Sequence, residues 1–218
     1  MDGYLRVNIS SRQLGSHRSW GAKAGKIAIF GEGNRRPRTL SLSLQSKKRE
    51  KMKKIGIFYG SSTGTTQELA GQIAQRLGVA PGDVHDIAST DVAQLEAYEV
   101  LLLGTSTWGA GDLQDDWQDF VDRLATKDLS GKVVGLFGCG DSYTYDTTFC
   151  DGIGRLYEAL RETGCRFCGA YIPQDYHFSA SMALVQGRLV GLAADQENEP
   201  EKTSARMEAR IEAMSEAL

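Results

Sequence analysis

From about residue 54 onward, short runs of apolar residues alternate with longer segments that have a helical period. The predicted strands cover 54–59 (KIGIFY), 84–87, 100–104 (VLLLG), 132–138 (KVVGLFG), 166–172 and 189–193. The predicted helices lie near 66–77, 115–125, 151–163 and 201–217, with a turn or short helix over 91–98. Apolar runs without polar alternation predict strands buried on both faces, as in a parallel sheet covered by helices. The alternation of strands and helices predicts right-handed crossovers and an α/β, doubly wound fold.

Residues 1–51 differ from the rest of the chain in composition and charge. They hold twelve Lys/Arg against three Asp/Glu, whereas residues 52–218 hold thirteen against twenty-five. The first segment is rich in Ser, Gly and Arg and has no sustained period, so we expect a disordered basic extension. A transit peptide or a nucleic-acid-binding arm would have a similar composition. The stretch KKREKM at 47–52 also fits a translated ribosome-binding site followed by a start codon, so we expect 1–51 to be translated leader and Met52 to be the start.

The composition of the remaining 167 residues is that of one globular domain. Of the whole chain, 41% is hydrophobic and 24% is charged, and no apolar run reaches the length of a membrane span. Cys165 and Cys168 form C-x-x-C, but they fall at the start of a predicted strand, whereas a redox motif needs its first Cys at a helix N-terminus. We therefore expect structural thiols in a cytoplasmic protein.

The loop after the first strand has the features of a phosphate cradle. The stretch FYGSSTGTT at 58–66 runs from a strand into a helix and carries five hydroxyls and two glycines. Free amides and the dipole at a helix N-terminus attract anions. The loop has no Lys or Arg and lacks the spacing of a Walker A loop. We therefore expect it to hold a single phosphate permanently and not to transfer it; a helix cap with solvated neighbours is the plainer alternative.

Two further loops follow the third and fourth strands, at the same predicted edge of the sheet. One is TSTWGAGDLQDDW, with Trp108, and the other is CGDSYTYDTTF, with Tyr143 and Tyr145. Single aromatic residues usually pack in the fold, but two beside a phosphate cradle are able to enclose a planar ring. A phosphate at one end and a flat ring at the other describe a mononucleotide.

These three loops together resemble those of the flavodoxin family. The resemblance rests on S-x-T-G-x-T, T-x-T-W-G-x-G-D-L-x-x-D-W and G-C-G-D followed by F-C-D, in this order, and covers residues 52–218. It implies a flavodoxin-like FMN-binding domain with a five-stranded parallel sheet in the order 2-1-3-4-5. The segment 172–188 matches the inserted loop that interrupts the fifth strand in long-chain flavodoxins.

The resemblance also implies a set of FMN-binding residues. The phosphate would be held by Ser61, Ser62, Thr63, Gly64, Thr65 and Thr66. Trp108 would cover the inner face of the flavin, Tyr145 the outer face, and Thr105, Ser106 and Thr107 the ribityl chain. The remaining positions are Gly109, Ala110 and Gly111 at the flavin edge, Cys139, Gly140, Asp141, Thr148 and Phe149 near the pyrimidine ring, and Asp195 near the ribityl hydroxyls.

The implied function is that of a low-potential one-electron carrier, with no catalytic side chain and no metal. FMN supplies the redox chemistry and the protein tunes it. The alternatives are an FMN-dependent quinone or nitro reductase, which needs open space above the flavin, and a phospho-receiver module, which needs an Asp where the chain has Gly104–Thr105.

We expect a monomer that meets basic redox proteins, such as a flavodoxin/ferredoxin-NADP reductase and low-potential oxidoreductases, and neither nucleic acid nor membrane. The acidic residues expected to steer these encounters are Asp112, Asp115, Asp116, Asp119, Asp141, Asp146 and Asp151.

Overall fold

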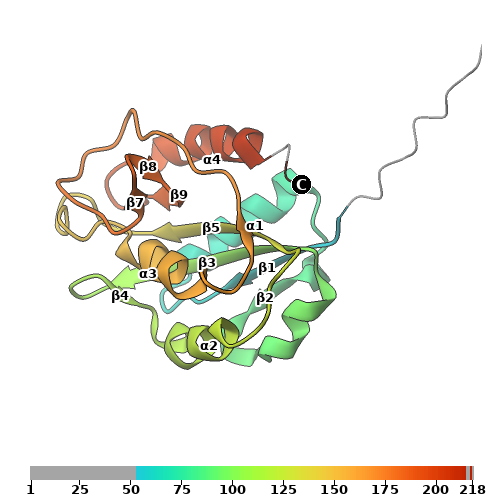
Figure 1. Cartoon of the computed structure of the whole chain (residues 1–218). Helices are drawn as coiled ribbons and strands as arrows, with labels where there is room; N and C mark the ends of the chain where they lie inside the picture. The colour runs from blue at the N-terminus through green and yellow to red at the C-terminus, as the bar shows by residue number, and fades with distance from the viewer. Residues whose placement is uncertain (1–52, 215–216, 218) are drawn as a thin grey trace, which may run out of the picture. The chain divides into compact units, whose positions relative to one another are not determined.

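The computed structural model describes residues 53–214 and 217, and the expectations for residues 1–51 lie outside this part. Its centre is a parallel sheet with β1 (Ile55–Tyr59) between β2 (Val84–Asp86) and β3 (Val100–Trp108), followed by β5 (Val133–Cys139) (Figure 1). The order is β2-β1-β3-β5, and the next position is shared by β6 and β9, both of which pair with β5. The predicted doubly wound order is therefore confirmed.

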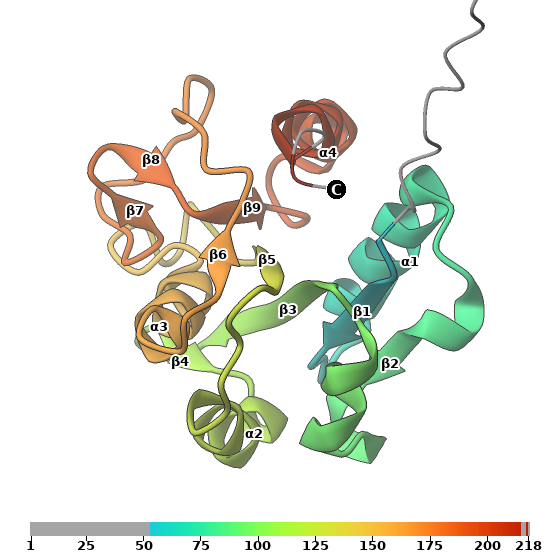
Figure 2. The same cartoon turned by 45° about the vertical axis from the view of Figure 1, so that its right-hand side comes forward.

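Two helices cover each face of the sheet, as the alternating pattern predicts. Figure 2 shows α1 (Thr65–Leu77) and α4 (Pro200–Met214) on one side, and α2 (Asp115–Ala125) and α3 (Asp151–Leu160) on the other. The edge strand β2 is flanked by short 3-10 turns at Pro81–Asp83, Ile87–Ser89 and Val92–Ala97.

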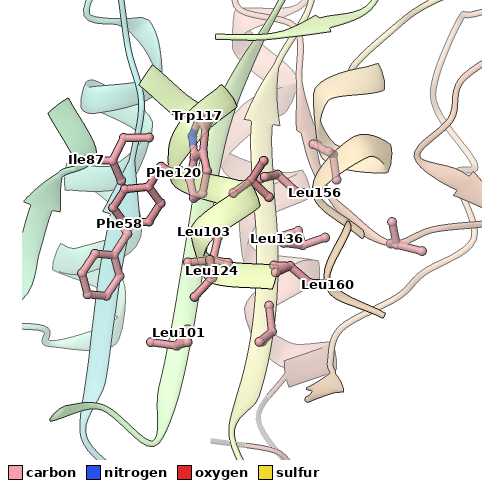
Figure 3. Close-up of a cluster of buried hydrophobic side chains, with 14 of the residues drawn as sticks. Phe58, Ile87, Leu101, Leu103, Trp117, Phe120, Leu124, Leu136, Leu156 and Leu160 are labelled. Atoms are coloured by element: carbon pink, nitrogen blue, oxygen red, sulfur yellow. The ribbon is translucent and has the colours of Figure 1, made fainter. Parts of the chain in front are cut away.

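Side chains of successive residues in β3 point to opposite faces of the sheet, because side chains alternate along a strand. Leu101 and Leu103 pack with α2 and α3 around Trp117, and Figure 3 shows these side chains in one cluster. Val100 and Leu102 belong to the second cluster, beneath α1 and α4. An uninterrupted apolar run is thus needed to fill two cores at once.

The fifth strand is interrupted, as the resemblance implies. Its first piece, β6 (Arg166–Phe167), pairs with Val133–Val134, and its second, β9 (Gly191–Ala194), pairs with Leu136–Cys139. The insertion between them contains a hairpin of β7 (Leu184–Val185) and β8 (Arg188–Leu189), which the sequence did not predict. The first piece was expected to reach residue 172 but ends earlier, because the chain turns away at Gly169, whose φ is +73°.

Buried Arg210 joins the two sides of this interruption. Its Nη2 donates to the carbonyl of Cys168, where the chain leaves the sheet, at 2.8 Å. The same atom donates to the carbonyl of Val190, where the chain returns, at 3.0 Å. A side chain of α4 therefore hydrogen-bonds to the chain on both sides of the interruption.

Other departures from the expected elements are small but affect the site. β3 continues to Trp108, four residues beyond the predicted end, and its tip pairs antiparallel with β4 (Asp112–Leu113). α3 ends at Leu160 instead of 163. No helix within residues 53–214 is both long and apolar enough to span a membrane.

Candidate functional site

A hollow of about 260 Å³ lies at the carboxyl ends of β1, β3, β5 and β9. Ligands of doubly wound sheets bind at this edge, beside the point where the strand order reverses. All three loops singled out in the sequence contribute to it. Its lining residues are Thr63, Thr65, Ser106, Thr107, Trp108, Gly109, Cys139, Gly140, Asp141, Tyr145, Gln196 and Glu197.

The first loop presents the start of α1 without a side-chain cap. Gly64, the residue before the helix, has a φ of +92°, and the helix has no side-chain cap. Ser61 Oγ accepts from the Gly64 amide at 3.1 Å, which closes the loop on itself. The Thr66 side chain is fully buried, and its hydroxyl has no partner within hydrogen-bond geometry; it lies near the Cys139 thiol, where it opposes the burial that raises the pKa of that thiol. An unpaired buried hydroxyl costs free energy, so this atom and the uncapped amides fit an anion such as a phosphate.

One aromatic wall of the hollow comes from the tip of β3. The indole Nε1 of Trp108 donates to Ser106 Oγ at 2.8 Å, and the side chain is half exposed. Thr107 Oγ1 accepts from the amide of Gly152, at the first turn of α3, at 3.1 Å. The strand tip is therefore fixed against a helix while the indole faces the hollow.

The other aromatic wall comes from the loop after β5. Asp141 Oδ1 accepts from the amides of Tyr143 and Thr144 at 3.0 and 2.8 Å. The pKa of Asp141 is lowered chiefly by hydrogen bonds from the side chain and amide of Thr144, with further contributions from Asn198 and the Tyr143 amide. The Tyr145 amide then donates to the Asp141 carbonyl at 3.1 Å. Tyr145 is half exposed and lines the hollow, whereas Tyr143, which is more exposed, does not.

The charge of the hollow is negative. Its ionisable lining residues are Asp141, Glu197, Cys139 and Tyr145, and it has no Lys or Arg in its lining. Burial raises the pKa of Cys139 to about 12, so this thiol is neutral at pH 7. A bound phosphate would meet amides and hydroxyls without a cationic side chain of this lining.

Ten of the twenty predicted binding residues line the hollow, and the other ten lie around it. Thr105 is buried, and its hydroxyl donates to the Ser106 carbonyl. Phe149 is also buried and stacks on Phe178 of the insertion, with the two ring centroids 5.4 Å apart. The remaining eight outside the lining are Ser61, Ser62, Gly64, Thr66, Ala110, Gly111, Thr148 and Asp195.

Asp195 has a structural setting that the sequence did not suggest. It is fully buried, and its Oδ2 accepts from the amide and hydroxyl of Ser142 at 3.0 and 2.5 Å. Its Oδ1 accepts from the Asn198 amide at 2.9 Å. The next two residues, Gln196 and Glu197, line the hollow instead. The sequence could have indicated Gln196 and Glu197, because they come directly after a parallel strand.

The expectation that Asp151 belongs to an exposed acidic surface is wrong. Asp151 is only 5% exposed, and its Oδ1 accepts from the Met182 amide at 2.7 Å. Burial raises the pKa of this carboxyl. Asp112, Asp115, Asp116 and Asp119 are exposed and remain available to a partner.

Comparison with known proteins assigns the family. The model of the family described as Flavodoxin matches residues 57–209, which is more than half of the chain. The chain belongs to the flavodoxin family. It is 43% identical over 164 residues to flavodoxin 1 of Escherichia coli K12, covering 75% of this chain and 93% of that protein. It is 42% identical over 165 residues to the flavodoxin of Klebsiella pneumoniae, covering 75% and 94%.

A solved structure agrees with this assignment. The flavodoxin of Fusobacterium nucleatum bound to flavin mononucleotide is similar at a TM-score of 0.71 and 30% identity, over 77% of this chain and 99% of that one. As a flavodoxin, the chain is an electron-transfer protein and not an enzyme. Among the described residues, no group of three or more His, Cys, Asp or Glu is arranged to hold a metal ion.

Proposed function

We propose that this flavodoxin binds FMN in the hollow at the carboxyl edge of its sheet and carries single electrons between redox proteins. The observation that supports this most directly is the unpaired buried hydroxyl of Thr66 at the uncapped start of α1. The F. nucleatum relative is bound to flavin mononucleotide, and the loop of this chain is suited to the phosphate of that ligand.

Within this proposal, the residues of the chain bind and orient the cofactor, and FMN supplies the one-electron chemistry. Ser61 to Thr66 hold the phosphate, and Trp108 and Tyr145 contact opposite faces of the flavin. Ser106 and Thr107 lie along the ribityl chain, and Gly109 and Gly140 let the backbone approach the ring. The acids Asp141 and Glu197 keep the surroundings negative, which disfavours adding negative charge to the flavin and so lowers its potential.

The phosphate contact is tested by comparing FMN with riboflavin, which lacks the phosphate. Thr66→Ala removes the hydroxyl, and Thr66→Ser retains it as a control. We expect Thr66→Ala to weaken FMN binding about tenfold, as for a hydrogen bond to a charged group, with riboflavin binding unchanged. Equal losses for both ligands would show that Thr66 supports the fold of the loop and does not contact the phosphate.

The partners of this flavodoxin are proposed to be larger redox proteins with basic surfaces, such as a flavodoxin/ferredoxin-NADP reductase. Four exposed acids lie near the hollow: Asp112 in β4, which pairs with the strand tip that carries Trp108, and Asp115, Asp116 and Asp119 in α2. We further propose that the protein is a monomer and that it is cytoplasmic, and the four free thiols support the second of these proposals. Electron-transfer rates that do not fall with rising ionic strength would contradict electrostatic steering. The alternative of an FMN-dependent reductase is not favoured, because the relatives are named as flavodoxins.

A further inference from the structure

Arg155 of α3 reaches across to the turn that connects β3 to β4. Its Nε donates to the Gly111 carbonyl at 2.5 Å, and its Nη2 lies 3.2 Å from Asp112 Oδ1. These contacts join residues 44 and 43 positions apart in the sequence. The turn they reach begins at Trp108, which forms one wall of the hollow.

Ordering the backbone of this turn costs conformational entropy, because the turn contains two glycines. Gly109 and Gly111 both have positive φ, at +51° and +101°. Its own closing bond runs from the Gly111 amide to the Trp108 carbonyl at 3.1 Å, and the β3–β4 pairing is only two residues long. Glycine loses more conformational freedom on ordering than any other residue, so such a turn gains from an external contact.

α3 provides that contact from two successive turns of one helical face. A Cβ added to Gly111 would lie 2.7 Å from Asp151 Oδ2, so the first turn of α3 already touches the glycine backbone. Arg155 follows Asp151 by four residues, which places it on the same face. The planar guanidinium has several donors in fixed geometry and reaches a carbonyl and a carboxylate at once, which a Lys ammonium does less well.

We propose that Arg155 is a positioning residue that fixes the Trp108–Asp112 turn in its ligand-ready conformation before the cofactor binds. It makes this contribution through the Gly111 carbonyl and the Asp112 carboxylate, not by touching the cofactor. The effect on affinity rests on the proposed FMN function, since a turn that is already ordered loses less entropy on binding.

The test uses the full-length chain with Arg155→Met, which keeps the length of the side chain and removes its donors. In the protein without cofactor, we expect faster hydrogen exchange at the Gly111 amide in the variant, because this amide closes the turn. We also expect about fivefold weaker FMN binding, because the variant has to order the turn when the ligand binds. Arg155→Lys should restore part of both.

Arg161→Met is the matched control, because Arg161 lies at the end of the same helix and pairs with the exposed Glu158 and Glu162. It loses the same charge but should change neither the Gly111 exchange rate nor FMN affinity. Unchanged Gly111 exchange in Arg155→Met, or an equal effect of Arg161→Met, would overturn the proposal. If Arg155→Met does not fold, Asp112→Ala removes only the ion pair and should give a smaller effect of the same kind. If the wild type binds no FMN, the proposed function fails, while the exchange experiment still decides the role of Arg155.

Discussion

Tyr145→Ala isolates the contribution of one aromatic wall to cofactor binding. Tyr145 is half exposed and lines the hollow, and its loop is held by backbone bonds to Asp141 that do not involve the phenol ring. The substitution should therefore leave the fold intact. It should also leave the phosphate cradle at the start of α1 unchanged.

The size of the effect follows from stacking. Stacking of an aromatic side chain on a nucleic-acid base contributes about 1–3 kcal/mol per base, and the flavin ring is comparable in kind. This range corresponds to about a fivefold to 150-fold change in Kd. Since half of the Tyr145 side chain faces solvent, we expect the lower part of the range, about tenfold.

The assay is a titration of the cofactor-free protein with FMN, followed by the quenching of flavin fluorescence. Tyr143→Ala is the matched control, because Tyr143 belongs to the same loop but does not line the hollow. Tyr145→Phe should bind FMN nearly as the wild type does, because the ring remains. An unchanged Kd for Tyr145→Ala, or an equal loss for Tyr143→Ala, would refute the assignment of Tyr145 to the flavin face.

Three further predictions concern the fold. Asp195→Ala should lower the unfolding free energy by about 2–4 kcal/mol in urea, because it leaves two buried donors of Ser142 and the partly buried Asn198 amide without their acceptor. A loss below about 0.5 kcal/mol would contradict a structural role. Trp117→Phe should lower the unfolding free energy by about 1–3 kcal/mol in the same assay, because the Gly104 carbonyl loses the hydrogen bond from the buried indole at 2.7 Å. An unfolding free energy equal to that of the wild type would exclude this contribution. Burial alone would raise the pKa of Glu199, but hydrogen bonds from Lys202, Arg206 and His177 lower this pKa to about 2. The ionised Glu199 therefore contributes stability above its unfolded pKa of about 4.5, and this contribution is lost as the pH falls toward 2. Glu199→Gln should flatten the pH dependence of the unfolding free energy in that window, and an unchanged slope would disagree with the Arg206 and Lys202 contacts.

The main strands and helices were predictable because their burial requires a particular pattern of side chains. The run at Val100–Leu103 has to fill two cores and therefore has no polar position. In contrast, β4, β7 and β8 have two residues each, too few to show a period, and they form because a partner strand lies beside them. The end of β6 likewise depends on the backbone conformation of Gly169, which a strand-like sequence does not reveal.

The same limit applies to the site. The three loops were singled out because each directly follows a parallel strand, whereas their individual binding residues were assigned by the resemblance. Asp195 was assigned to the ligand by resemblance, but its carboxylate is occupied by Ser142 and Asn198, and its neighbours Gln196 and Glu197 face the hollow. The contact of Arg155 with Gly111 joins two elements that only the folded chain brings together.

The most direct test of the central claim is electron transfer measured with and without FMN. The protein is freed of cofactor, reloaded with FMN, and supplied with NADPH, a flavodoxin/ferredoxin-NADP reductase and cytochrome c as the final acceptor. We predict that only the FMN-loaded protein accelerates cytochrome c reduction, and that it does not oxidise NADPH when the reductase is left out. Equal acceleration by the cofactor-free protein, or NADPH oxidation without the reductase, would contradict an FMN-dependent electron carrier.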